Sequence, residues 1–134
     1  MHTYQILTKR PERALEVSHK VQWTNNIWQG TSVENNRVTG RIDILREIPA
    51  KVRFISCEPL IGPLNDLNLL GIHWVIVGGE SGPGSRKMEE QWVRDIQVQC
   101  AASEVAFFFK QWGGVHKHLT GRLLDGKEWS EFPV

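Results

Sequence analysis

Cysteine is scarce in this chain, and its scarcity limits the metal chemistry that the chain can support. The 134 residues include two cysteines, Cys57 and Cys100, and neither belongs to a Cys-x-x-Cys pair. A three- or four-cysteine zinc site or an iron–sulfur cluster needs clustered thiolates, which this chain alone does not supply. Because Cys100 falls on the apolar side of a predicted helix, we expect its thiol to be buried and unreactive.

The sequence also lacks a long apolar run and a strong excess of either charge. No segment approaches the roughly 20 apolar residues that span a bilayer, and the N-terminus does not resemble a signal peptide, so we expect a cytoplasmic location and no membrane partner. The formal net charge is +1, which does not indicate nucleic-acid binding. Hydrophobic residues make up 40% and charged residues 23% of the chain, which predicts one packed domain.

Five short apolar segments alternate with segments of helical periodicity. We expect strands at 2–7, 27–33, 51–56, 73–77 and 105–109, and helices at about 12–21, 36–48 and 88–102. This alternation predicts an α/β fold with a mostly parallel sheet of about five strands. We expect the leucine-rich segment 60–70 to hold one short helical turn. Near the C-terminus, Asp125-Gly126 lies between 121–124 and 127–132 and predicts a small β-hairpin.

Polar residues follow every predicted strand. The carboxyl ends of parallel strands meet at one edge of a sheet, so we expect these residues to converge on a rim that binds a small molecule. The candidates are Lys9, Arg10, Glu34, Asn35, Glu58, Gly79, Glu80, Ser81, Lys110 and Trp112. None of them is identified as catalytic by its pattern, and no metal site is indicated.

Three glutamates and one lysine carry most of the chemistry of this rim. Glu34, Glu58 and Glu80 end three different strands, and several carboxylates together suit a hard cation, an amine or a ribose. A single glutamate at such a position more often caps a helix or pairs with a basic residue, but three at matched strand ends favour a shared binding site. Lys110 suits an anion or a base, and a salt bridge to Glu58 or Glu80 explains it equally well.

Other residues near the rim allow two interpretations each. The glycine-rich segment 78–84 opens a helix, so its backbone N–H groups suit a phosphate, although it matches neither the P-loop nor G-x-G-x-x-G and also fits a simple turn. Trp112 either forms a stacking wall for a flat ligand or packs in the core. Lys9 and Arg10 either orient an anionic substrate or are solvated. Cys57 has no histidine at a neighbouring strand end, so catalysis by its thiol is a minority interpretation.

Six long segments carry a family resemblance that extends from Tyr4 to about Pro133. They are YQILTKRPER, IWQGTSVEN, VRFISCEPLIGPL, WVIVGGESGPGSR, FFFKQWGG and GRLLDGKEW, in this order. Together they closely resemble the C-terminal portion of a phage-associated protein family of the gp thirty-seven / gp sixty-eight type. Members of that family look like radical-SAM proteins and carry a cysteine cluster for an iron–sulfur centre nearer the N-terminus.

The resemblance implies a single domain, 1–134, with a partial (β/α) barrel in 1–114 and the hairpin as an extension in 115–134. It also implies a place for S-adenosylmethionine at the rim and no iron–sulfur cluster on this chain alone. The family pattern Gly-x-Ile-x-Gly-x-x-Glu does not fit around Ile76, because residue 81 is serine. We therefore expect a phage-related protein that binds a ligand and is catalytically incompetent alone.

Two alternatives from other classes remain beside this expectation, and whether the chain is an enzyme stays open. One alternative is a stand-alone module that binds a nucleotide or small anion, and the other is a degenerate phage remnant without activity. A partial barrel exposes strand edges and an apolar interior. We therefore expect either a homodimer or a partner chain that supplies the missing barrel half.

Overall fold

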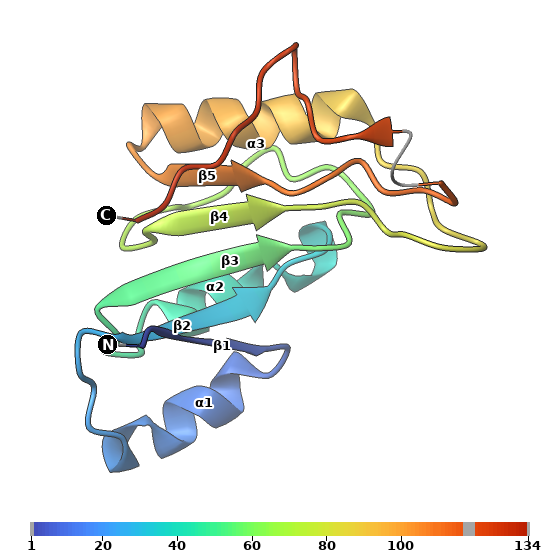
Figure 1. Ribbon diagram of the computed structural model, residues 1–134. Coiled ribbons are helices and arrows are strands. Elements are labelled where there is room, and N and C mark those ends of the chain that lie inside the picture. The colour runs from blue at the N-terminus through green and yellow to red at the C-terminus, as the bar shows by residue number, and fades with distance from the viewer. Residues whose placement is uncertain (1, 117–119, 134) are drawn as a thin grey trace.

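The computed structural model describes residues 2–116 and 120–133, and its centre is one open sheet of five parallel strands. The strands are β1 (Tyr4–Thr8), β2 (Ile27–Ser32), β3 (Val52–Cys57), β4 (Trp74–Val77) and β5 (Ala106–Phe109). They lie side by side in chain order, so β1 and β5 form the two edges (Figure 1). The α/β class and the parallel sheet predicted from the alternating pattern are confirmed, and the sheet does not close.

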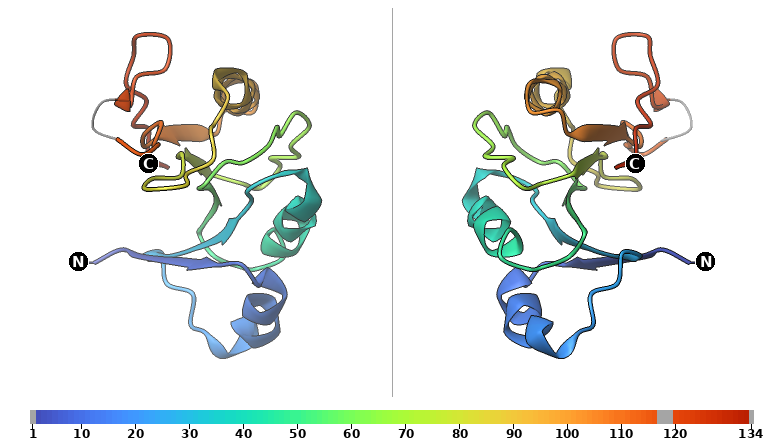
Figure 2. Two further views of the ribbon diagram at one scale, coloured as in Figure 1. Left: turned by 90° about the vertical axis from the view of Figure 1, so that its right-hand side faces the viewer. Right: turned by 90° about the vertical axis from the view of Figure 1, so that its left-hand side faces the viewer.

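Helical segments connect the strands and cover one face of the sheet. They are α1 (Pro11–Val17), η1 (Ser18–Lys20), η2 (Asn36–Val38), α2 (Gly40–Leu45) and α3 (Glu90–Ala102). Figure 2 shows α1 and α2 on the same side of the sheet, with the C-terminal segment toward the other side. Pro11 begins α1, where its missing N–H group costs no hydrogen bond. Among the described residues, no helix is long and apolar enough to cross a membrane.

The prediction of a helical turn in segment 60–70 is wrong, since these residues have no regular secondary structure. Pro63 and Gly62 disfavour a helix here, yet the leucines still serve the core. Leu60, Leu64 and Leu69 are each at most 4% exposed and join the cluster on the helix-covered face. The buried leucine side chains therefore cover this part of the sheet face, although no helix is present here.

The helix-covered face holds the main core. Side chains alternate along a strand, so Ile55, Val75 and Phe107 point to the helices and are at most 1% exposed. Val93 and Ile96 of α3 pack into the same cluster. Cys100 is also buried on this helix, as its position on the apolar side predicted.

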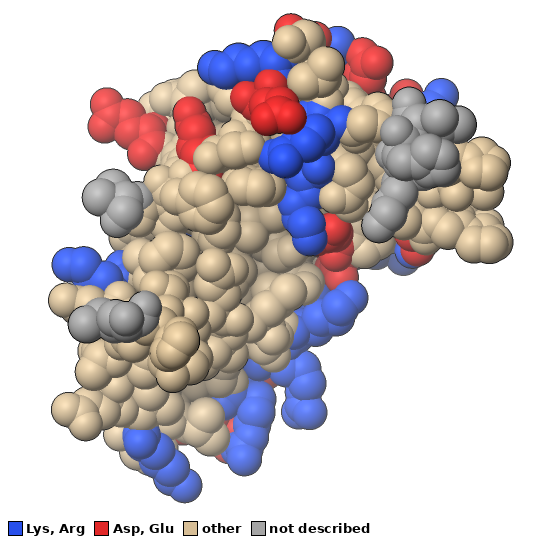
Figure 3. Space-filling view, viewed as in Figure 1, with Lys and Arg blue, Asp and Glu red and all other residues tan. Residues whose placement is uncertain are grey.

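The opposite face of the sheet has no helix and is rich in aromatic rings. Trp74 lies at its centre, with ring centroids 5.9 Å from Trp28, 5.7 Å from Phe54, 6.1 Å from Phe108 and 5.2 Å from Phe132. We call these five residues the aromatic cluster. Figure 3 views this helix-free face, where uncharged surface fills much of the middle and charged side chains of both signs lie around it.

The predicted C-terminal hairpin is not confirmed. The Asp125-Gly126 turn does form, with hydrogen bonds in both directions between the backbones of Leu124 and Lys127, but no strand extends from it. Residues 129–131 instead run antiparallel along β5, where Phe109 N–H donates to Trp129 O and Glu131 N–H donates to Phe107 O. The free edge of β5 thus competes successfully for the backbone groups that a hairpin would have used.

Candidate functional site

The helix-free face contains a groove that runs along β3, β4 and β5 to their carboxyl ends, and Gln5 and Leu7 of β1 also line it. Its volume is about 320 Å³. Rings of the aromatic cluster, Trp74 and Phe108 among them, line its floor, and Ser56, Glu58 and Lys110 line its polar end. The groove therefore presents an apolar floor and a charged pair to one ligand, which is a common composition for a small-molecule site.

Glu58 and Lys110 form the charged pair at the polar end of the groove. Lys110 Nζ donates to Glu58 Oε1 at 3.0 Å, and Gln111 Nε2 donates to Glu58 Oε2 at 3.1 Å. The lysine side chain is 45% exposed and that of the glutamate 28%. Such a half-exposed pair contributes only about 0–1 kcal/mol to stability, so replacing the ion pair by contacts to a ligand would cost little.

Two serine hydroxyls lie on the same face just below this pair. Ser32 and Ser56 are paired in the β2–β3 register and are 3% and 5% exposed. No described residue forms a hydrogen bond with either hydroxyl, and neither oxygen is among the fully buried polar atoms that lack a partner. Ser56 lines the groove, so its hydroxyl is available to a ligand. Sequence reasoning missed both serines because it considered only residues beyond the strand ends.

Glu34 belongs to a second ion cluster, at the ends of β1 and β2. Lys9 Nζ lies 2.6 Å from Glu34 Oε2, and Arg41 Nη1 lies 3.2 Å from Oε1. Burial opposes ionisation of Glu34, but the hydrogen bond from Lys9 and the two positive charges outweigh it and lower its pKa. Asn35 caps η2 by accepting the Arg37 N–H at 2.9 Å. Lys9 and Asn35 thus support this end of the sheet and lie outside the groove.

Glu80 is held within its own loop by Arg86. The guanidinium and backbone N–H of Arg86 donate to the Glu80 carboxylate at 2.8 to 3.0 Å. The side-chain hydrogen bonds, followed by the backbone one, lower the pKa of Glu80 to about 2. The three glutamates therefore pair with three different sets of cations. Across residues 2–116 and 120–133, no group of three or more His, Cys, Asp or Glu side chains could hold a metal ion.

The glycine-rich segment crosses closely over the loop that follows β5. A Cβ on Gly79 would overlap Trp112 O, and one on Gly113, whose φ is +78°, would overlap Glu80 O. Gly79 N–H donates to Gln111 O at 2.9 Å, so it has no donor left for a phosphate. Ser81 forms a parallel bridge with Gly114 and its side chain is exposed. Only glycine allows the two loops to cross this closely.

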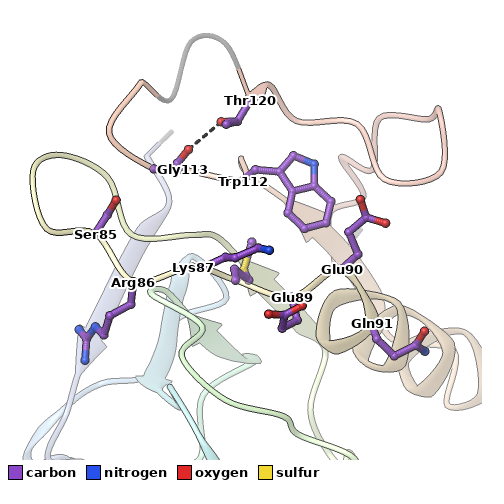
Figure 4. A pocket seen from close by; sticks show the side chains of 11 residues that line it. Ser85, Arg86, Lys87, Glu89, Glu90, Gln91, Trp112, Gly113 and Thr120 are labelled. Carbon is purple, nitrogen blue, oxygen red and sulfur yellow. Dashed lines mark hydrogen bonds between the residues drawn. The ribbon is translucent and has the colours of Figure 1, made fainter.

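A second pocket, of about 700 Å³, lies beside this crossing at the start of α3. Figure 4 shows the Trp112 indole above the chain that carries Lys87 and Glu90. The indole packs against Phe109 at 4.8 Å between centroids, and its N–H donates to Leu123 O at 2.8 Å. The ring therefore packs on one side and lines a pocket on the other, and its stacking on a flat ligand stays a prediction.

Two of the remaining candidates lie away from both pockets. The backbone N–H of Arg10 donates to Thr8 Oγ1, and within the described part of the chain its exposed guanidinium forms no hydrogen bond or ion pair. Cys57 is fully buried on the helix-covered face, and burial raises the pKa of its thiol. Such a thiol is a poor nucleophile. Burial also raises the pKa of Cys100 to about 12.

The family of this chain is known, although its activity is not. A family model described as a protein of unknown function, DUF5131, matches residues 1–133. The chain belongs to this family. The DUF5131 match covers the groove, the second pocket and every candidate residue. No match was found among the curated proteins or among the solved structures. The chemistry of this DUF5131 chain must therefore be inferred from its own residues.

Proposed function

We propose that this chain is the ligand-binding part of a phage-related, radical-SAM-like protein of the cytoplasm. The ligand of its groove is a small zwitterion with a flat ring, and S-adenosylmethionine is the candidate that the sequence resemblance implies. One observation carries the proposal: Glu58 and Lys110 meet at the polar end of an aromatic groove. The charged pair lies where parallel strands end, which is where α/β sheets bind their ligands.

The arrangement of the sheet supports this proposal. Parallel strands in chain order with helices on one side form the basic unit of a (β/α) barrel, whose inner face carries no helix. The groove is on the corresponding face. Active sites of such barrels lie at the carboxyl ends of the strands, the end at which Glu58 and Lys110 are found.

The groups in the groove are complementary to a zwitterion. Glu58 accepts a hydrogen bond from an ammonium group, and Lys110 pairs with a carboxylate. The Ser56 hydroxyl supplies a further donor or acceptor, since no described residue forms a hydrogen bond with it. Rings of the aromatic cluster offer an apolar surface to a planar group.

The described residues do not fit an iron–sulfur cluster. Its usual ligands are cysteine thiolates, whereas Cys57 and Cys100 are buried on the other face of the sheet. The proposed role of this chain is therefore to bind the ligand without performing radical chemistry on its own. A stoichiometric four-iron cluster on the purified chain after reconstitution with iron and sulfide would contradict this part of the proposal.

Titration calorimetry with S-adenosylmethionine tests the ligand assignment. We expect Glu58→Gln and Lys110→Met each to weaken binding by about tenfold or more, because each removes one charge-assisted contact. Glu47→Gln is the matched control for the glutamate, since Glu47 is exposed before the start of β3, at the opposite end of the sheet. No binding by the wild-type chain, or equal loss in the control, would exclude the groove as the site.

The pocket beside Trp112 supports a second candidate function, that of a module that binds a nucleotide or small anion. A fixed indole and the ammonium of Lys87 line this pocket, and a flat base with a phosphate suits both. Thermal stabilisation by adenosine nucleotides but not by S-adenosylmethionine, lost in Lys87→Met and kept in Lys20→Met, would favour this function. The reverse pattern would favour the groove.

A further inference from the structure

The two edges of the sheet differ in how they are protected. Along β5, residues 129–131 pair antiparallel with the strand and use its outer backbone groups. Along β1, no strand of the described chain lies on the outer side, because β1 pairs only with β2. One edge is thus closed by the chain itself, and the other presents unpaired N–H and C=O groups.

The side chains of β1 add to this exposure. The described residues include nine exposed large hydrophobics, and three of them, Tyr4, Ile6 and Leu7, are on this strand of five residues at 55%, 46% and 50% exposure. Because side chains alternate, Tyr4 and Ile6 expose one face of the strand and Leu7 exposes the other. The strand Tyr4–Thr8 contains no proline and no charge, the usual features that discourage pairing at an edge.

The hydrogen bonds of β1 show which backbone groups are free. Tyr4 N–H donates to Asn26 O at 2.7 Å, and the Ile6 and Thr8 carbonyls accept from the side chains of Gln29 and Thr31. The backbone groups of Tyr4, Ile6 and Thr8 therefore point toward β2. Since successive residues alternate in direction, the N–H and C=O groups of Gln5 and Leu7 point away from β2, toward the open edge of the sheet.

We propose that β1 pairs antiparallel with β1 of a second copy of this chain, about a two-fold axis through Ile6. In this register Gln5 lies opposite Leu7 of the second copy, and these are the residues whose backbone groups point outward. They form the hydrogen-bonded pairs of the new ladder. Ile6 lies opposite Ile6 of the second copy in a non-hydrogen-bonded pair, where Cα atoms approach to about 4.5 Å.

Charge and symmetry favour a second copy as the occupant. The register places Lys9 and Arg10 opposite Thr3 and His2 of the second copy, so the basic residues do not face each other. Tyr4 lies opposite Thr8, a favourable aromatic and β-branched pair. Because residues 129–131 close the other edge, the described residues leave one edge free, and the two-fold axis closes the pairing at that edge. The pairing uses the backbone groups of Gln5 and Leu7, whose side chains also line the groove on the helix-free face.

Disulfide trapping tests the register. Ile6→Cys places two thiols opposite each other at a Cα separation of about 4.5 Å, which a disulfide spans. We expect this variant to form a covalent dimer rapidly under mild oxidation. Tyr4→Cys is the matched control, because its opposite residue is Thr8, and we expect slow cross-linking. The wild-type chain gives the baseline, since Cys57 and Cys100 are buried. Equal cross-linking rates for the two variants would overturn the register.

Sedimentation velocity over a micromolar concentration series tests the dimer itself. We expect the wild-type chain to sediment as a dimer, and Ile6→Lys, which opposes two like charges on the axis, to weaken it by about tenfold or more. Gln5→Pro is a second test, since the N–H that it removes points outward and the β1–β2 ladder keeps its bonds. Circular dichroism verifies that both variants stay folded. A monomeric wild-type chain throughout the series would overturn the proposal.

Discussion

Adjacent residues of β3 lie in two different environments. Ile55 points to the helices and is completely buried among aliphatic side chains, whereas Phe54 and Ser56 point to the helix-free face. On the first face, helices and the leucines of segment 60–70 exclude water. On the second face, the cover comes from the aromatic cluster and the C-terminal segment, whose Phe132 remains 57% exposed.

This difference separates stability from ligand access. The helix-covered face contains the hydrophobic cluster and two inert cysteines. The helix-free face has the groove, the hydroxyls of Ser32 and Ser56, and the Glu58–Lys110 pair. Substitutions on the first face should therefore lower the free energy of unfolding, whereas those on the second should affect it less and affect binding more.

The largest expected effect comes from a matched pair of isoleucines. Ile55→Ala removes a fully buried side chain on the helix-covered face and should lower the free energy of unfolding by about 3–4 kcal/mol. Ile76→Ala, in the partly exposed groove, should lower it by about 1 kcal/mol, since the site admits water. Urea denaturation measures both. Equal losses would show that the helix-free face is as tightly packed as the other.

Gly30→Ala should cost about 2 kcal/mol of stability, because the new methyl group overlaps the ring of Phe54 on the helix-free face. Phe54 is 2% exposed, so its ring has little room to move. Gly40→Ala is the control, since a Cβ there meets nothing within 4 Å. An unchanged urea midpoint for Gly30→Ala would show that the aromatic cluster is loosely packed. The difference in packing between the two faces of the sheet would then be larger than inferred.

Phe132→Ala should lower the free energy of unfolding by about 1 kcal/mol, because a half-exposed ring loses its contacts with Trp74 and Phe108. The same change opens the groove, so the affinity for its ligand should change more than stability does. Tryptophan fluorescence reports on the new environment of Trp74, and calorimetry reports on binding. If Phe132→Ala were unfolded, the C-terminal segment would contribute as much to stability as the main core does.

The smallest expected effect is the pH dependence due to Glu80. Hydrogen bonds from Arg86 lower its pKa from an ordinary 4.5 to about 2, so the folded state favours the ionised form. Its stabilising contribution is complete above about pH 4.5 and declines as pH falls toward 2. Glu80→Gln should therefore lose less stability than the wild-type chain between about pH 7 and about pH 3. Urea midpoints at both values test this, with Glu47→Gln as control.

Much of the fold could be predicted from local patterns. The apolar runs identified five strands near their observed bounds, because a buried parallel strand needs a continuous apolar segment. Pro11 and Asn35 marked helix starts through local backbone chemistry. The hairpin at Asp125-Gly126 was not confirmed because β5, about 20 residues earlier, competes for the same backbone groups, and local turn preference does not report such competition.

The candidate site was predicted only in part. Glu58 and Lys110 were among the strand-end residues, and their pairing was one of the alternatives considered. Lys9, one partner of Glu34, was also among the strand-end residues. Arg41 from α2 and Arg86 from a loop, which pair with Glu34 and Glu80, do not follow strands, so strand-end reasoning missed them. Ser32 and Ser56 were missed because serine within a strand is unremarkable until its neighbours are known.

The amino-acid sequence by itself determined the order of strands and helices and the parallel direction of the sheet, because hydrophobic periodicity and turn residues act over short distances. It also determined that polar residues follow each strand. Only the tertiary structure decided which charges pair, which face stays without a helix and which edge remains open. These outcomes depend on contacts between residues far apart in the chain, where geometry selects among several equally suitable partners.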